Sequence, residues 1–323
     1  MTTQINLTSS VKLEGLFTLE VIDTLTGKVT KKVGPFKNLI TNAGLDDIWS
    51  GVQSSSGNQW LIIAFVGTGN TAPAVTDTQM TALLAPTSYA FPAFLSPMSA
   101  WTYVAAAGSV PPYWTSIGTW SFAAGQATGT LTEVGIGVPT STSTYRLDSH
   151  ALIVDGSGNP TTITVLSNEQ LNVTYTLNLY WDVTTYTGTV SISGVTYNIS
   201  WLPCNLPTTS GTSYKSLSSG GASFWSYLTG YNGSLGTPLT LPSGSSGDNA
   251  SGPSSYGAYS TGQYYIDVTW SCDINHMNLI GGITVLTLGS NFHQFQIGFS
   301  PAIPKTSSYS FTFVCRFAWA RYP

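Results

Sequence analysis

Charged side chains are scarce in this sequence. Asp, Glu, Lys and Arg make up 7% of its 323 residues, whereas an average soluble domain contains roughly 25%. Surface helices normally carry a charged outer face, so this composition argues against a helical protein. Disorder is excluded as well, because disordered chains combine high net charge with few aromatic residues, and 12% of this chain is aromatic.

Ser, Thr, Gly, Asn and aromatic residues take the place of charge. Hydroxyl-bearing, β-branched and aromatic side chains fit pleated strands. We therefore predict an all-β chain, built as one or more antiparallel β-sandwiches with long Gly/Ser/aromatic loops and one or two short helices. A composition shift near residue 185 predicts a β-rich region at 1–185 and a second β-rich, loop-rich region at 186–323 that closes with a C-terminal strand, with a single domain as the alternative.

Basic residues are also few. Ten Lys and Arg against fourteen Asp and Glu give a net charge of -4, whereas nucleic-acid binders carry a basic stripe. The composition therefore argues against a nucleic-acid partner. Four of the lysines cluster near the start of the chain among alternating apolar residues, and we interpret them as a solvated strand edge: Lys28, Lys31, Lys32 and Lys37.

Cysteine is rare and long apolar runs are absent. Cys204, Cys272 and Cys315 are far apart and show no Cys-x-x-Cys spacing, so no disulfide framework is expected. The N-terminal residues "MTTQINLTSS" do not resemble a secretory signal. The longest strongly apolar run, "WLIIAFV" at 60–66, is much shorter than the ~20 residues of a membrane helix. We expect a protein made and kept reduced in a cytoplasm and not inserted into a membrane.

Several segments have clear local patterns. Residues 12–36 alternate apolar and polar side chains around a turn at Thr26-Gly27-Lys28, and residues 188–202 do so around Ser193-Gly194, which predicts two hairpins. Residues 38–52 predict one short helix with Thr41 or Asn42 as its cap. Residues 60–66 predict a buried strand, and residues 207–262 have the composition of loops.

The motif "GTGNTA" at 67–72 resembles a dinucleotide-binding fingerprint. Pro73 interrupts the helix that should follow, although Thr76 and Gln79 have the spacing of a capping box before a possible helix. No Asp or Glu lies between Asp77 and Glu133 to hold a ribose. We expect no nucleotide and no other cofactor.

The common signatures of hydrolases and metal sites are missing. No Gly-x-Ser-x-Gly elbow occurs, and His150, His276 and His293 lack ligand spacing, so we expect neither a catalytic serine nor a metal site. His276 is the one histidine with acidic and thiol neighbours, Asp273 and Cys272, and we interpret it as a loop or strand-end residue.

The stretch "DGSGNP" at 155–160 combines acidic, glycine and asparagine residues as a calcium loop does. Ser157 and Asn159 are neutral and Glu169 is distant, so we interpret the stretch as a turn in which Asp155 and Asn159 bond their own backbone and the glycines adopt positive φ. The flanking "TTITVL" and "LNVTYTLNLYW" are predicted to pair as strands around "SNEQ".

Paired carboxylates could perform glycoside hydrolysis if the fold brought two of them within ~5 to 9.5 Å. The candidates are Glu133, Glu169, Asp267 and Asp273. No repeat of the kind found in long-groove depolymerases is visible, so we do not expect an enzyme.

Aromatic residues in the loop-rich region are candidates for receptor binding, since aromatic rings stack on sugars, although they are equally suited to subunit packing: Trp225, Tyr227, Tyr231, Tyr256 and Tyr259. The last strand, "SFTFVCRFAWARY", is apolar on both faces, which predicts burial in a sandwich core or in a subunit interface. Its interface candidates are Phe311, Phe313, Phe317 and Trp319.

Several segments together resemble tail fibre or tail appendage proteins of tailed bacteriophages. They keep their order along the chain: "FKNLITNAGLD", "VGTGNTAPAVTDT", "LTEVGIG", "ALIVDGSGNPTTITVLSNEQLNVTYTLNLY", "TGTVSISGVTYN", "FQIGFSPAIPKT" and the terminal "WAR". The family is defined by virion structure, so no active-site residue is carried over. In "SHALI", His150 stands where the resemblance implies an arginine.

The resemblance implies a subunit of the virion tail that is assembled in the host cytoplasm, with its N-terminal region docking to the virion. We expect a homo-oligomer, a trimer, whose partners are copies of itself, other virion proteins and a glycan or protein of the host surface. Two alternatives stay open: a head decoration, collar or adaptor subunit without host contact, and a polysaccharide depolymerase.

Overall fold

The computed structural model describes residues 2–53, 60–87, 101–140, 144–192, 194–204, 227–247, 250–251, 255–289, 294–308 and 310–323. Strands dominate these residues, and α1 (Asn42–Gln53) is the only helix among them. Most strand pairs are antiparallel; the pair of β1 (Thr2–Asp23) with β21 (Phe311–Arg321) is parallel. The all-β prediction is confirmed. The possible helix after Thr76 is not formed, because residues 83–86 are strand β5.

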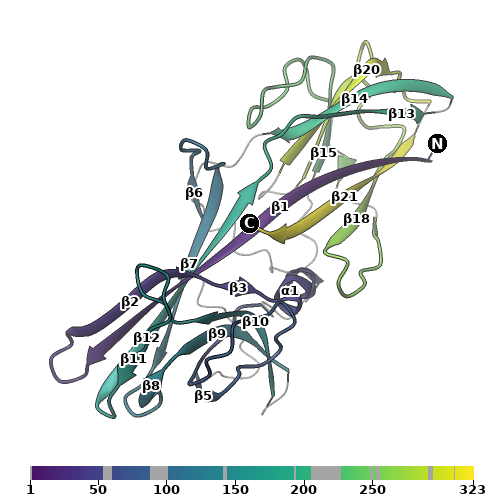
Figure 1. Ribbon diagram of the computed structural model, residues 1–323. Coiled ribbons are helices and arrows are strands. Elements are labelled where there is room, and N and C mark those ends of the chain that lie inside the picture. Colours follow the sequence, from purple (N-terminus) through teal and green to yellow (C-terminus); the bar gives the residue numbers. More distant parts are fainter. Residues whose placement is uncertain are drawn as a thin grey trace.

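The largest sheet has eight strands and extends along the molecule (Figure 1). β1 is its long inner strand, with β12 (Glu169–Trp181) on one edge and β21 followed by β2 (Val29–Lys37) on the other. Alternate β1 residues from Val11 to Val21 are buried, as a period of two requires. The strand order is β17 (Ser255–Tyr256), β18 (Tyr265–Cys272), β21, β1, β12 (Glu169–Trp181), β7 (Tyr113–Phe122) and β6 (Thr102–Val104), with β2 (Val29–Lys37) beside β1.

Three further sheets complete the described part. The five-stranded sheet has the order β3 (Leu39–Ile40), β10 (Tyr145–Leu152), β9 (Glu133–Pro139), β4 (Ile63–Gly67) and β5 (Leu83–Pro86). A two-stranded sheet pairs β11 (Ile163–Val165) with β8 (Gly129–Leu131). The six-stranded sheet has the order β13 (Tyr186–Ile192), β14 (Val195–Cys204), β20 (Gln294–Ile303), β19 (Ile283–Gly289), β15 (Tyr227–Tyr231) and β16 (Ala250–Ser251).

Both predicted hairpins are confirmed. β1 and β2 flank a turn in which Gly27 has a φ of +68°, and β13 and β14 flank one in which Gly194 has a φ of +81°, values that glycine adopts without steric cost. The buried strand expected at 60–66 is present as β4.

Two strand predictions need correction. β11 pairs with β8 and not with β12, because the longer strands β1 and β7 occupy both edges of β12. The loop prediction for residues 207–262 is also incomplete. β15, β16 and β17 lie within this segment, where pairing with β19 and β18 outweighs local composition, while residues 205–226 lie outside the described residues.

The helix α1 begins where the sequence predicts it. The Thr41 hydroxyl accepts a hydrogen bond from the Gly44 amide at 2.9 Å and donates one to the Leu147 carbonyl at 2.6 Å. It therefore caps the helix and fixes it to β10 at the same time. A Cβ on Gly44 would lie 2.1 Å from the Asp148 carbonyl oxygen, so glycine permits this close packing.

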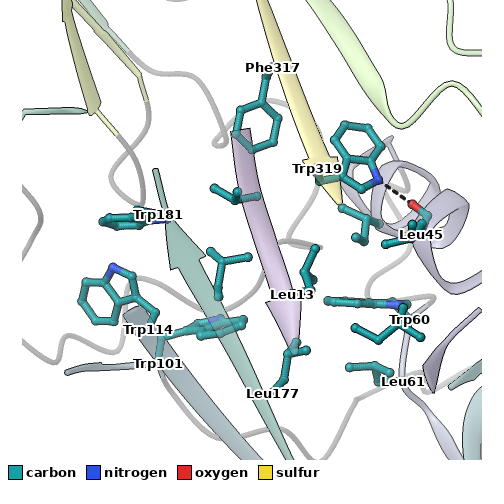
Figure 2. Close-up of a cluster of buried hydrophobic side chains, with 14 of the residues drawn as sticks. Leu13, Leu45, Trp60, Leu61, Trp101, Trp114, Leu177, Trp181, Phe317 and Trp319 are labelled. Atoms are coloured by element: carbon teal, nitrogen blue, oxygen red, sulfur yellow. Dashed lines mark hydrogen bonds between the residues drawn. The ribbon is translucent and has the colours of Figure 1, made fainter. Parts of the chain in front are cut away.

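One hydrophobic cluster joins the large sheet to the other layers. Figure 2 shows Trp319 of β21 reaching α1, where its Nε1 donates to the Leu45 carbonyl at 2.7 Å. Leu13 and Leu177 lie between this contact and the buried indoles of Trp114 and Trp181. Residue 185 falls between β12 and β13, and strands from both sides of it pair within the eight-stranded sheet.

Candidate functional site

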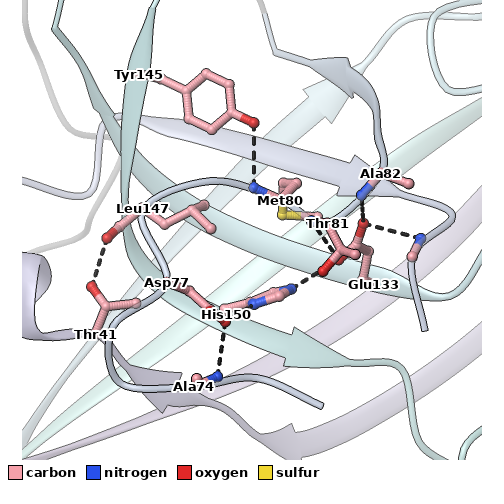
Figure 3. Close-up of polar contacts among 11 residues, drawn as sticks. Thr41, Ala74, Asp77, Met80, Thr81, Ala82, Glu133, Tyr145, Leu147 and His150 are labelled. Carbon is pink, nitrogen blue, oxygen red and sulfur yellow. Dashed lines mark hydrogen bonds and ion pairs between the residues drawn. The ribbon is translucent and has the colours of Figure 1, made fainter. Parts of the chain in front are cut away.

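A densely bonded polar group joins the five-stranded sheet to a neighbouring loop (Figure 3). Glu133 begins β9 and His150 lies on β10, where the register places them as diagonal neighbours on one face. Asp77 comes from the loop at 68–82 between β4 and β5. His150 Nε2 lies 2.9 Å from Glu133 Oε2, and His150 Nδ1 lies 2.7 Å from Asp77 Oδ2.

Glu133 also binds the backbone of the 68–82 loop. Its Oε1 accepts hydrogen bonds from the amides of Gly69 at 3.0 Å and Ala82 at 2.8 Å, and its Oε2 accepts one from Thr81 at 3.2 Å. The Glu133 side chain is 0% exposed. Its four hydrogen-bond donors compensate the energetic cost of burying the charged carboxylate. This one side chain therefore fixes both ends of the loop.

The glycines of "GTGNTA" are explained by the same carboxylate. An ideal Cβ on Gly67 would lie 2.4 Å from Glu133 Oε1, and one on Gly69 would lie 2.6 Å from it. Both positions need glycine because the carboxylate fills the space that a side chain would take. The motif therefore packs around a buried acid.

The charge of this group follows from its contacts. Burial raises the pKa of Glu133, but the hydrogen bonds from His150 and the loop amides outweigh it and lower the pKa to about 2. Burial lowers the pKa of His150, yet its hydrogen bonds to Glu133 and Asp77 outweigh burial and raise it. Both ring nitrogens of His150 lie within hydrogen-bond distance of a carboxylate oxygen, an arrangement that suits the protonated ring because only that form donates from both nitrogens. An arginine, which the resemblance implies at this position, would supply the same positive charge.

A second charged group lies between α1 and β10. Asp47, with a side chain 1% exposed, accepts hydrogen bonds from Arg146 at Nε (3.1 Å) and at its NH2 group. Asp148 is fully buried and its Oδ2 accepts the Leu61 amide at 2.8 Å. Burial first, then the charge of Asp47 and a hydrogen bond with it, raises the pKa of Asp148 well above its usual range. This favours a protonated Asp148 beside an ionised Asp47.

The carboxylates considered for glycoside hydrolysis are each engaged elsewhere. Glu169 is buried, with Lys31 Nζ 3.1 Å from its Oε2 and the Leu166 amide 2.8 Å from the same oxygen. Asp267 pairs with Arg316 at 2.8 Å. Asp273 Oδ1 lies 2.6 Å from Nδ1 of His276. These contacts hold strands and turns together. In the His150 group the side chains of Glu133 and His150 are buried, while the side chain of Asp77 is 26% exposed.

The receptor-binding candidates lie in different environments. Trp225 and the side chain of Tyr227 lie outside the described residues. Tyr231 is half-buried. Tyr256 is half-buried against the hydrophobic core, and this burial raises its pKa.

Tyr259 is anchored to α1. Its hydroxyl donates to Asp46 Oδ1 at 2.5 Å, and its ring stacks on Trp319 at a centroid distance of 5.8 Å. Burial first, then Asp46, raises its pKa. The tyrosine thus joins the 257–264 turn to the helix, and one side of its ring is covered by the chain itself.

The interface candidates all lie on β21. Phe313, Phe317 and Trp319 are buried within the chain, and Phe311 is half-buried against the same core. β21 pairs with β1 on one side and with β18 on the other, within the same sheet. The period-two pattern is present, and these side chains pack in the core of the chain.

The sequence did not indicate that Asp77, Glu133 and His150 meet, because they come from separate segments without any characteristic spacing. One signal was present: Glu133 is the only charged residue of β9, a strand buried at six of its seven positions. A lone acid in such a strand must find donors. No comparable feature of the sequence indicated that Asp47 and Asp148 would be buried together.

No group of three or more His, Cys, Asp or Glu residues that could hold a metal ion occurs in the part of the chain that the structure describes. Nor does any helix within the described ranges have the length and apolar character to span a bilayer. No family model, curated protein or solved structure matches the chain. Functional inference therefore rests on its residues and their geometry.

Proposed function

We propose that this chain is a structural subunit of a bacteriophage tail fibre or tail appendage that attaches the virion to the host surface. The observation that carries the proposal is that the segments resembling this family, although far apart in the sequence, bind one another. In "WAR", Arg321 donates to the Ile40 carbonyl and to Asn42 Oδ1, both in "FKNLITNAGLD".

The middle segments are connected in the same way. Gly69 of "VGTGNTAPAVTDT" donates to Glu133 of "LTEVGIG", and β4 pairs with β9. The resemblance therefore involves residues that hold the framework together, which supports a shared architecture. Residues of this kind vary less readily than surface loops do.

Adhesion suits the surface chemistry of the chain. With 7% charged residues, its surface offers hydroxyl, amide and aromatic groups. Such contacts are weak individually and gain strength from several copies held together, because the second contact forms at high effective concentration. A homotrimer on the tail would supply these copies, and the other partners would be neighbouring virion proteins and a host glycan or protein.

Immunogold labelling of intact virions with antibody against the purified chain tests the proposal. Label at the tail is the expected result, whereas label on the head or neck, or none, contradicts it. Light scattering after size exclusion is expected to give a trimer, and a monomer at micromolar concentration contradicts the oligomeric part. Incubation with host polysaccharide is expected to release no reducing ends.

A further inference from the structure

A polar groove of about 540 Å³ lies between β2 and the segment that leads into β11. One wall is formed by residues 31–34 of β2, and the other by residues 155–156 and 161–164. Figure 1 shows β2 and β11 close together at the end of the molecule where the β1–β2 hairpin turns. The volume falls within the range of roughly 300 to 1,000 Å³ of small-molecule sites.

The walls of the groove are fixed by the chain itself. Asp155 Oδ1 accepts hydrogen bonds from the amides of Ser157 at 2.8 Å and Asn159 at 3.0 Å, which closes the 155–159 turn. Lys31 Nζ donates to the Thr164 carbonyl at 2.8 Å and so joins β2 to β11. A ligand would meet a preformed surface and would not have to order it.

The charges around the groove are already compensated. Lys31 pairs with Glu169 at 3.1 Å, and Lys32 pairs with Glu20 at 2.8 Å. An anion would therefore have to compete with two carboxylates and would also meet the charge of Asp155. A cation would find Asp155 as the only carboxylate of the lining. These charges disfavour strongly ionic ligands of either sign.

The lining offers hydrogen-bonding groups that suit a hydroxylated ligand. Thr161 is half-buried and Thr162 is exposed, and neither hydroxyl bonds to another group in the described part of the chain. Asp155 supplies acceptor oxygens, and the two lysines supply donors. Hydroxyl groups both donate and accept, so they can use all three kinds of partner.

A peptide strand is a poor fit for the same place. Within the described residues β2 pairs with β1 alone, so one edge of it is open. That strand carries Lys31, Lys32 and Lys37 and contains Pro35, which has no N–H to donate. Lysine and proline on an edge strand hinder the addition of another strand.

We propose that the groove between β2 and residues 155–164 binds a neutral saccharide, with Thr161, Thr162 and Asp155 as its hydrogen-bonding partners. This inference rests on the proposed function, since a host glycan is the surface ligand that such a groove would engage. It places saccharide recognition on the hairpin end of the molecule, away from the tyrosines of the loop-rich region.

Saturation-transfer difference NMR of the full chain tests the proposal with glucose, galactose, mannose and N-acetylglucosamine and their disaccharides at millimolar concentration. At least one neutral sugar is expected to give a signal. The double variant Thr161→Val, Thr162→Val keeps the side-chain shape and removes both hydroxyls, and it is expected to bind about tenfold more weakly. A second double variant, Thr187→Val, Thr189→Val on exposed β13, is the matched control and should bind as the wild type does.

Absence of a signal from every neutral sugar overturns the proposal, as does an unchanged signal in the groove variant. N-acetylneuraminate and inorganic phosphate serve as anionic probes, and binding of these alone also overturns it. The labelling experiment on virions separates this failure from that of the proposed function. Label at the tail without any sugar binding contradicts only the proposal that the groove binds a saccharide. Sugar binding together with label on the head contradicts the proposed tail location and supports saccharide binding in the groove.

Discussion

The imidazole of His150 and the carboxylate of Glu133 meet at 2.9 Å inside the five-stranded sheet, and the second ring nitrogen of His150 is bonded as well, to Asp77. A neutral imidazole has one donor and one acceptor, so it cannot donate to both carboxylates. The protonated ring satisfies both contacts. The sheet and the 68–82 loop are therefore held together by a buried ion group.

This group predicts a pH dependence of stability. The pKa of His150 is raised in the folded chain, so its contribution is full below the unfolded pKa of about 6.5 and is lost as pH rises through the folded value. His150→Gln removes the cation and leaves two carboxylates without it. We expect the variant to lose about 2 to 4 kcal/mol in the free energy of unfolding at pH 6, with a smaller loss at pH 9.

Urea unfolding of the wild type and the variant at pH 6, 7.5 and 9 measures this difference. Glu20→Gln, which removes the half-buried partner of the exposed Lys32, is the control and should cost at most about 1 kcal/mol at each pH. A deficit of His150→Gln that stays constant from pH 6 to pH 9 would show that His150 is not the titrating cation.

The glycines around Glu133 give a second prediction. Gly69→Ala places a Cβ 2.6 Å from Glu133 Oε1 and at the same distance from the Thr81 Cβ. The carboxylate or the loop must shift, and we expect a loss of about 1 to 3 kcal/mol in thermal or urea unfolding. Gly156→Ala is the matched control, because no atom lies within 4 Å of its Cβ, and it should change stability by about 0.5 kcal/mol or less. Equal effects of the two substitutions would contradict the role given to Gly69.

Local pattern predicted much of the fold. The hairpins about Gly27 and Gly194 and the helix after Thr41 each follow from a few adjacent residues whose side chains determine the backbone. The partner of β11 was predicted wrongly. The short "SNEQ" link favours pairing with β12, but β1 and β7 are longer and occupy both edges of that strand.

The polar centre could not be predicted for a different reason. Glu133 and His150 become neighbours only through the register of β9 and β10, and Asp77 reaches them from a loop. Such a constellation depends on pairing between strands and leaves no fixed spacing in the sequence. The groove beside β11 has the same origin, since Lys31 and Thr164 are joined by tertiary structure.

The three cysteines give a third prediction. All are buried, and burial raises the pKa of Cys204 to about 12 and that of Cys272 to about 11, and raises that of Cys315 as well. Because the thiolate is the reactive form, we expect no reaction of the native chain with a disulfide reagent at pH 8. The denatured chain should react at all three cysteines and release three equivalents of the reagent's thiol per chain. Rapid labelling of any cysteine in the native chain would contradict its burial.

Asp148 and Asp47 give the last prediction, because they are neighbouring carboxyl groups in different protonation states. The folded pKa of Asp148 is raised by burial and by Asp47, so folding keeps a proton that the unfolded chain releases above about pH 3.9. The contribution of Asp148 to the free energy of unfolding is therefore largest below that pH. It decreases as pH rises toward the folded pKa, by at most about 1.4 kcal/mol per pH unit. Asp148→Asn should remove this decline.

Asparagine keeps an acceptor for the Leu61 amide and, like the protonated acid, has no negative charge to place beside Asp47. We expect Asp148→Asn to match the wild type near pH 4 and to be more stable at pH 8 in urea unfolding. Asp47→Asn removes the ion pair with Arg146 and should cost about 2 to 4 kcal/mol at pH 7. If Asp148→Asn is the more damaging substitution at pH 8, then Asp148 is ionised in the folded chain and the assignment of the proton to it is wrong.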